Sequence, residues 1–360
     1  MLLGGTKRVP HVASNNKPAP DFPSRRISPH PFSHMSATFT HIVALPAAAL
    51  VWLGNQGTRA IAALVFIGIA VPPAGELLRP YVTEAIFLLL CVSFLRVDLG
   101  MLREYLRRPG LVLAATGWTV LAVPLISGGI WRLTGVDLRS PDLYLALMLQ
   151  AVASPMMAAP ALAGVMGLDS TLVLITLVIG TALVPVTAPL FAYIFLGSAL
   201  TLSPFALGLK LLAILAGSVC VAGAIRWSTG SDAIKRHARL IDGMTVIFLF
   251  VFVSAVMGNV AGGFWSDPVR ALKLTLLAFA VFFALMAVTA LIFRKAGYER
   301  AMALGLMVSQ RNMGLMLAAT DGILPGTTWL YFALSQFPIY LTPQLLKPFV
   351  QRLGKREAQS

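Results

Sequence analysis

Long apolar runs follow one another from residue 58 to residue 349, separated by short breaks rich in proline, glycine and charged residues. Each run is about as long as a helix must be to cross the hydrocarbon core of a bilayer. The polar helix faces that a soluble all-α core would need are missing. We therefore predict an all-α polytopic membrane protein with about ten transmembrane helices, at residues 58–75, 82–98, 110–133, 143–166, 171–196, 204–226, 241–262, 271–294, 298–320 and 327–349.

Two of these runs are interrupted near their middle. The first interruption runs from Gln150 to Pro160 and contains two prolines, at positions 155 and 160, which disturb a helix. The second runs from Ser309 to Gly314 and begins with four polar residues in a row. The interrupted run is the fourth in each half of the chain. An odd number of spans per half inverts the second half, so we predict two inverted five-helix repeats, 58–196 and 204–349. The alternative is a bundle of ordinary packed helices with incidental prolines.

The flanking segments have a different composition. Residues 1–40 are rich in proline, serine and basic residues and predict a disordered tail. Residues 41–57 predict a short interfacial helix and turn, with a full span as the alternative. We expect a turn at Pro72–Gly75 and a tail at 350–360.

The charge pattern indicates membrane topology. The net charge is +14, and fifteen basic residues lie in or next to the loops 97–109, 227–240 and 295–300 or after residue 346, against five on the opposite side. Cytoplasmic loops carry such an excess of Lys and Arg, which places both termini in the cytoplasm and the chain in the inner (plasma) membrane. The same pattern argues against nucleic acid as the partner of these cations, and leaves the lipid bilayer as the expected surrounding.

Composition narrows the function further. Hydrophobic residues make up 58% of the chain and charged residues 12%, against about 25% charged in a soluble domain. No phosphate loop, Ser/His/Asp set or metal-ligand spacing is present, so we expect no enzyme and no cofactor, and a metal site stays unknown. Cys91 and Cys220 lie in apolar runs and predict no disulfide framework.

The two interruptions supply the candidate substrate site. Arg311 is a permanent cation near mid-membrane, where its guanidinium fork suits a carboxylate or another oxyanion. Freed carbonyls beside Pro155 are tolerated at membrane depth only where they are buried in protein or line a wet cavity. The remaining candidates are polar groups at or near the interruptions: Ser309, Gln310, Asn312, Ser154, Gln150 and Thr181.

Each candidate has a structural alternative. Arg311 would then pair with backbone carbonyls of the other interrupted helix and only hold the fold. The prolines at 155 and 160 would form a kink that helps packing. Thr181 would make a hydrogen bond between helices.

The motifs resemble a known family. Leu95-Arg96-Val97-Asp98-Leu99 with Arg108-Pro109, the stretch Ala153–Gly164, the pair Pro185 and Pro189, and Gln310–Gly314 are similar to motifs of the bile acid:sodium symporter family, within the bile/arsenite/riboflavin transporter superfamily. The resemblance covers residues 58–349. It implies ten helices in two inverted five-helix units, with a panel domain and a core domain in which the two broken helices cross.

The chain departs from the family's sodium-coupled members at several positions. Pro160 and Ala161 stand where those members carry a Ser-Asn pair. Met307 stands where they carry a Glu, and Arg311-Asn312 where they carry a Gln-Asn pair. Sodium as the coupling ion is therefore left open. Our hypothesis is that the Arg311 guanidinium takes the place of a bound cation and favours an organic anion.

We therefore predict a secondary active transporter of a small organic anion that works by alternating access. One alternative is an arsenite-type or other solute exporter, although the family's arsenite exporters use a cysteine near the first interruption and this chain has none there. An alternative of another class is a non-transporting membrane sensor, whose mark would be an appended soluble domain. The oligomeric state, monomer or homo-oligomer, stays open.

Overall fold

The computed structural model describes residues 48–53, 55, 63, 67, 70–97, 109–197, 202–258 and 260–357, all of which belong to the unit that spans residues 47–360. Every regular element within these residues is a helix. Six helical stretches are long and apolar enough to cross a membrane: Pro72–Leu95, Pro109–Leu133, Ser170–Leu196, Pro204–Thr229, Ala238–Ser266 and Pro268–Ile292. The chain is therefore helical, and these six stretches indicate a membrane-embedded protein.

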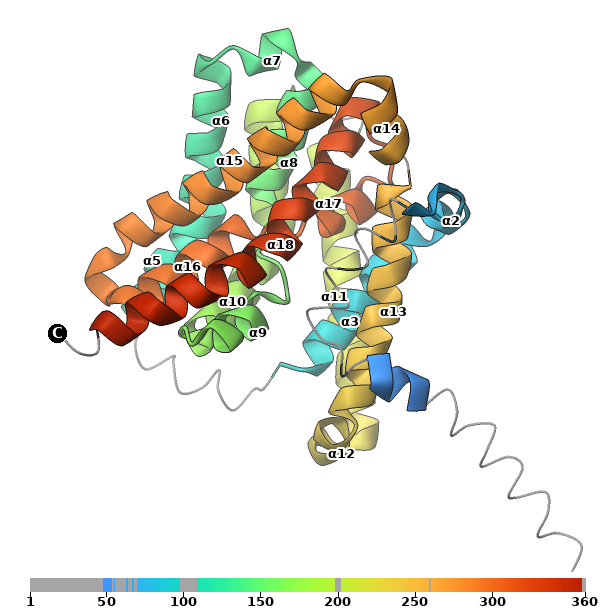
Figure 1. The fold of residues 1–360 in the computed structure, drawn as a ribbon, viewed down its shortest axis with the longest axis vertical. Coiled ribbons are helices and arrows are strands. Elements are labelled where there is room, and N and C mark those ends of the chain that lie inside the picture. The colour runs from blue at the N-terminus through green and yellow to red at the C-terminus, as the bar shows by residue number, and fades with distance from the viewer. Residues whose placement is uncertain are drawn as a thin grey trace, which may run out of the picture. The chain divides into compact units, whose positions relative to one another are not determined.

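The helices in chain order (Figure 1) are α2 (Pro72–Leu78), η1 (Arg79–Tyr81), α3 (Val82–Leu95), α5 (Pro109–Gly117), η2 (Trp118–Ala122), α6 (Val123–Leu133), α7 (Val136–Arg139), α8 (Pro141–Val152), α9 (Ala159–Met166), α10 (Ser170–Phe191), η3 (Ala192–Leu196), α11 (Pro204–Thr229), α12 (Ser231–Arg236), α13 (Ala238–Met257), α14 (Val260–Ser266), α15 (Pro268–Ile292), η5 (Arg294–Ala296), α16 (Tyr298–Ser309), α17 (Met313–Ala319) and α18 (Gly326–Glu357). Most long helices continue through their predicted spans, whereas the predicted spans 143–166 and 298–320 are each divided in two.

Local sequence explains where several helices begin. Asp169, Ser203 and Asp267 precede α10, α11 and α15, and each side chain accepts a hydrogen bond from the backbone N–H three residues later. These caps satisfy N–H groups that have no partner within the helix. In α11 and α15 a proline follows the cap directly, at a position where the missing N–H costs nothing.

Two predicted boundaries are wrong. The expected turn at Pro72–Gly75 is the first turn of α2, because its prolines occupy initial helical positions rather than interrupting a helix. The helix predicted to end at residue 349 continues to Glu357. Polarity suggested a tail there, but Gln, Arg, Leu, Lys and Glu are all good helix formers, so a polar composition does not end a helix.

Other predicted segments lie wholly or largely outside the described residues. They include the tail 1–40, most of the span 58–75, and residues 98–108, which hold most of the motif that begins at Leu95. Within the predicted interfacial segment, residues 48–53 are helical. The carbonyl of Leu50 lies directly against Gly243 of α13, where a Cβ atom would be only 2.0 Å away.

We describe the helices as two groups, which share one continuous hydrophobic core and are joined by extensive contacts of α10 and α17. In the first group, α2 and α3 pack against α13, and α3 also packs against α11 (Figure 1). In the second group, α15 packs against α16 and α18, α8 packs against α6 and α18, and α10 packs against α5 and α9. Helices α10 and α17 of the second group contact α11 of the first, and α17 also contacts α3.

Glycine allows unusually close contact within the first group. A Cβ atom on Gly258, which caps the end of α13, would lie 2.7 Å from the Cα atom of Gly75 in α2, and one on Gly75 would lie 2.4 Å from the Cα atom of Gly258. Both neighbours are backbone atoms, which cannot move aside as a side chain could. The α2–α13 contact therefore depends on the absence of a side chain at both positions.

Candidate functional site

The first helix break lies between α8 and α9. Helix α8 ends at Val152, and Ala153 has the extended backbone angles φ −62° and ψ 148°. Helical winding resumes at Ala159, with Pro160 in the first turn of α9. Prolines at positions 155 and 160 cannot donate backbone hydrogen bonds, which accounts for a break in this stretch.

The second break lies between α16 and α17. Helix α16 ends at Ser309, and Gln310 is extended with φ −89° and ψ 91°. Helix α17 begins at Met313, and the Asn312 side chain accepts a hydrogen bond from Leu315 N at 3.3 Å. Asn312 thus serves as the N-cap that restarts the helix.

The two breaks are joined by their backbones. Met156 N donates to Gln310 O, and Asn312 N donates to Ser154 O, each at 2.7 Å. The pair forms an antiparallel β-bridge between Pro155 and Arg311. Backbone groups freed by one break are therefore satisfied by the other, as burial inside the protein requires. Both breaks predicted from the sequence are present, and they contact each other.

The side chain of Arg311 is buried, with 2% of its surface exposed. Its Nη1 donates to Ala153 O at 2.9 Å, and both terminal nitrogens contact Thr119 O at 3.4 Å. Its Nε–H has no hydrogen-bond partner among the described residues. None of the ion pairs found in the described chain includes Arg311.

The Thr119 carbonyl is available because the helix is locally wound more widely. Residues Trp118–Ala122 form a π-helical turn, in which Val123 N donates to Trp118 O rather than to Thr119 O. The next residue, Pro124, has no N–H to donate. The Thr119 carbonyl is thus left without its usual partners within the helix, and the guanidinium takes their place.

This geometry matches the structural alternative considered for Arg311, which was pairing with backbone carbonyls of the other broken helix. It links the π-helical turn, the first break and the second break through one side chain. The carbonyls solvate the guanidinium but carry no formal negative charge. A buried cation without a counter-charge creates a positive potential around the breaks, and anions are favoured nearby.

A pocket of about 110 Å³ opens beside the breaks. We call it the candidate pocket. One wall comes from α3 and α13, and the other comes from both breaks and α18. Its lining residues are Ile86, Leu89, Leu90, Ser93, Met156, Met157, Ala158, Thr245, Leu249, Phe252, Arg311, Asn312, Met313, Gly314, Gln336, Ile339 and Tyr340. A mostly apolar lining with a few polar groups is typical of small-molecule sites.

Two of the predicted site residues, Arg311 and Asn312, line the candidate pocket, and Pro155 takes part in the β-bridge beside it. Gln150 instead accepts a hydrogen bond from Tyr331 Oη at 2.7 Å, within the contact between α8 and α18. Ser309 Oγ donates to Leu306 O of its own helix at 2.8 Å. Neither of these two lines the pocket.

The other three predicted residues are buried with incomplete hydrogen bonding. Gln310 Nε2 donates to Ile339 O at 3.3 Å, but its Oε1 has no partner within the described chain. The hydroxyl oxygens of Ser154 and Thr181 also lack partners there. Buried polar atoms without partners are unusual and often occur at functional sites.

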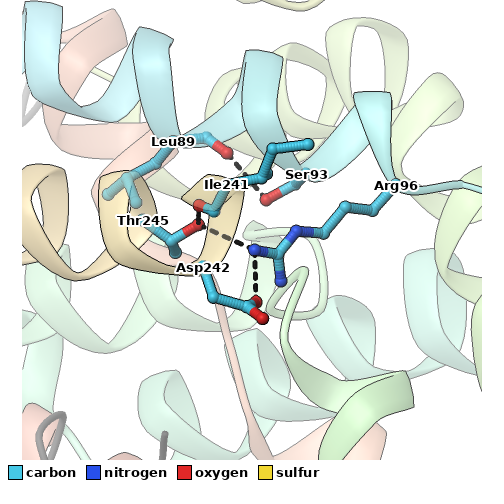
Figure 2. A network of polar contacts seen from close by, with 6 residues as sticks. All are labelled: Leu89, Ser93, Arg96, Ile241, Asp242 and Thr245. Carbon is cyan, nitrogen blue, oxygen red and sulfur yellow. Dashed lines mark hydrogen bonds and ion pairs between the residues drawn. The ribbon is translucent and has the colours of Figure 1, made fainter. Parts of the chain in front are cut away.

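Sequence reasoning missed the wall formed by α3 and α13. Ser93 and Thr245 face the candidate pocket there, and each hydroxyl bonds to a carbonyl four residues earlier in its own helix (Figure 2). Arg96 Nη2 donates to Thr245 Oγ1 at 3.3 Å and also pairs with Asp242. The available signal was a lone hydroxyl in each apolar run, which does not reveal which face of a helix meets the site.

Comparison with protein-family models finds no match to this chain, and comparison with curated proteins finds no significant match.

Proposed function

We propose that this protein is a secondary transporter of a small organic anion. The observation that carries the proposal is the candidate pocket, which has one wall from α3 and α13 and the other from two broken helices and α18. Paired helix breaks at mid-membrane are a recurrent way to build substrate sites in secondary transporters. In this proposal the anion enters the pocket from one side of the membrane and leaves on the other.

The grouping of the helices supports the proposed inverted-repeat architecture. The first group contains α3 from the first half of the chain, and α11 and α13 from the second. The second group contains the three later spans of each half, including both broken helices. Apart from the span 58–75, which is largely outside the described residues, corresponding spans of the two halves are therefore assigned to the same group. We infer ten spans in two inverted five-helix repeats, with the first group as the panel domain and the second as the core domain.

The polarity of the site supports an anionic substrate. Arg311 contributes a buried positive charge, whereas no Asp or Glu is among the residues that line the candidate pocket. Hydrogen bonds to the substrate would come from Asn312, Gln336 and Tyr340. The carbonyl contacts of Arg311 use both N–H groups of Nη1 and one of Nη2. In this proposal the main role of the guanidinium in this conformation is therefore to supply the field.

Alternating access follows from the two walls. The β-bridge holds the two breaks together, so they would move as one body against α3 and α13. Such a motion would expose the candidate pocket to one side and then to the other. We place the protein in the inner membrane with both termini in the cytoplasm, as the loop charges favour.

Uptake by the purified protein in liposomes tests this proposal. A panel of small carboxylates and sulfonates is first screened for ligands that raise the melting temperature, since binding to the folded state stabilises it. The best ligand is then used for uptake with and without a sodium gradient. Leu249→Trp places a bulky indole ring in the pocket wall. Ile247→Trp adds the same ring at a more exposed position on α13.

The proposal expects Leu249→Trp to abolish uptake and Ile247→Trp to leave it within about twofold, with both variants folded. Equal uptake by both variants would show that the candidate pocket is not the route. Arsenite transport in the absence of organic-anion uptake would instead favour the exporter alternative. Dependence on the sodium gradient would assign sodium as the coupling ion.

A further inference from the structure

A second pocket, of about 510 Å³, lies where the end of α3 meets α11, α12 and α13. We call it the basic pocket. Three cations line it, Arg96, Arg226 and Lys235, together with the single carboxylate of Asp242. It shares no lining residue with the candidate pocket. Among these lining residues the positive charges outnumber the negative one, which favours an anionic ligand.

The two arginines are held in place by bonds from one nitrogen each. Arg226 Nη2 donates to the carbonyls of Leu95 and Val97 at the end of α3. Arg96 Nη2 contacts Asp242 and Thr245 (Figure 2). In both side chains, Nη1 and Nε make no hydrogen bond to the described residues. Each guanidinium is therefore fixed in position and retains N–H groups for a ligand.

Apart from Ser231, the rest of the lining is apolar, and it lies at the end of long apolar helices. Ile234, Ala238 and Ile241 contribute to the wall. Helix α11 ends at Thr229, and Trp227 in its last turn is 91% exposed. Exposed tryptophans are characteristic of the membrane–water interface. A pocket that combines cations with an apolar wall at this level suits an anionic amphiphile better than a small hydrophilic ion.

From these observations we propose that the basic pocket binds the headgroup of an anionic phospholipid. The phosphate would accept hydrogen bonds from Arg96 and Arg226 and lie close to Lys235, while the upper part of the acyl chains contacts the apolar wall. Basic pockets between membrane helices bind lipid headgroups by this chemistry. This proposal does not depend on the transport function proposed above.

The test uses the purified full-length chain and native mass spectrometry, with phosphatidylglycerol and phosphatidylcholine added at equal concentrations. Lys235→Gln removes one cation from the pocket wall. Arg236→Gln is the matched control, because it removes one cation from the next position on α12 but that residue does not line the pocket. Thermal unfolding is measured for each variant, with inorganic phosphate as a separate addition.

We expect the wild-type protein to retain phosphatidylglycerol in preference to phosphatidylcholine. Lys235→Gln should weaken that binding roughly fivefold, and Arg236→Gln should weaken it by less than about twofold. Equal weakening in both variants would overturn the proposal, because it would indicate only the general surface potential. Stabilisation by inorganic phosphate equal to that by the lipid would also overturn it, in favour of a soluble anion. Absence of a headgroup preference would do the same.

Discussion

The charge of the substrate is tested most sharply at Asn312, which lines the candidate pocket and caps α17. Asn312→Asp keeps the cap, since Asp and Asn are equally good at this position. It adds a negative charge to the pocket wall while Arg311 and the β-bridge stay unchanged. Asn312→Ser also keeps a capping side chain, remains neutral and serves as the control.

The size of the effect follows from the size of the pocket. A bound anion and a carboxylate on the wall of so small a pocket would lie about 6 Å apart. At an effective dielectric constant of about 20, two like charges at that separation repel by about 2.8 kcal/mol. Such a repulsion weakens binding roughly a hundredfold.

The assay is equilibrium binding of the best ligand from the anion panel, with the melting temperature of each variant as a check on folding. We expect Asn312→Asp to bind about a hundredfold more weakly and Asn312→Ser within about tenfold of wild type. A change of less than threefold for Asn312→Asp would mean that the anion does not occupy this pocket. Tighter binding would mean that the ligand is a cation.

Three further predictions concern the buried groups. Arg311→Met should lower the unfolding free energy by about 1–3 kcal/mol, because it leaves the carbonyls of Ala153 and Thr119 without their donor. The folded variant should bind the anion at least tenfold more weakly in the same assay, whereas Arg311→Lys should keep most of the binding; equal binding by both would refute the role of the charge. Ser154→Ala should raise the unfolding free energy by about 1 kcal/mol, since its hydroxyl has no partner among the described residues. The control Ser309→Ala loses a hydrogen bond to its own helix and should not be stabilised. A lower unfolding free energy for Ser154→Ala would indicate that this hydroxyl has a structural role. Gly258→Ala should lower the unfolding free energy by about 1–3 kcal/mol, because the new methyl group clashes with the backbone of α2. Gly129→Ala should leave the unfolding free energy unchanged, because a Cβ atom there has open space around it. Thermal unfolding of the two variants tests this difference.

The positions of the helix breaks could be predicted because their causes are local. Prolines at 155 and 160 remove backbone donors, and polar residues from Ser309 to Asn312 interrupt an apolar run. The extent of each break was harder to predict. Gln150 lies within the first predicted interruption, yet it remains helical, and its amide oxygen accepts a hydrogen bond from Tyr331. A side chain's partner on a distant helix cannot be inferred from the residues around it.

The partner of Arg311 shows the same limit. The sequence indicated that this buried cation needs oxygen ligands, and it left open whether substrate or backbone supplies them. The ligand at Thr119 depends on a π-helical turn some two hundred residues earlier in the chain. Pro124 was the only local sign of that turn, and a proline in an apolar run more often predicts a simple kink.

The wall formed by α3 and α13 was not predicted for a related reason. Both helices are mostly apolar, and their few polar residues do not form a continuous face, so periodicity does not distinguish the side toward lipid from the side toward the candidate pocket. Ser93 and Thr245 mark that side only once the packing of the helices is known.

The β-bridge between the two breaks is made from main-chain atoms alone, namely the N–H groups of residues 156 and 312 and the carbonyls of residues 154 and 310. Every amino acid except proline can supply such an N–H. Side chains at this joint are therefore free to diverge during evolution, so that a new substrate preference could arise there while the mechanical connection is inherited intact.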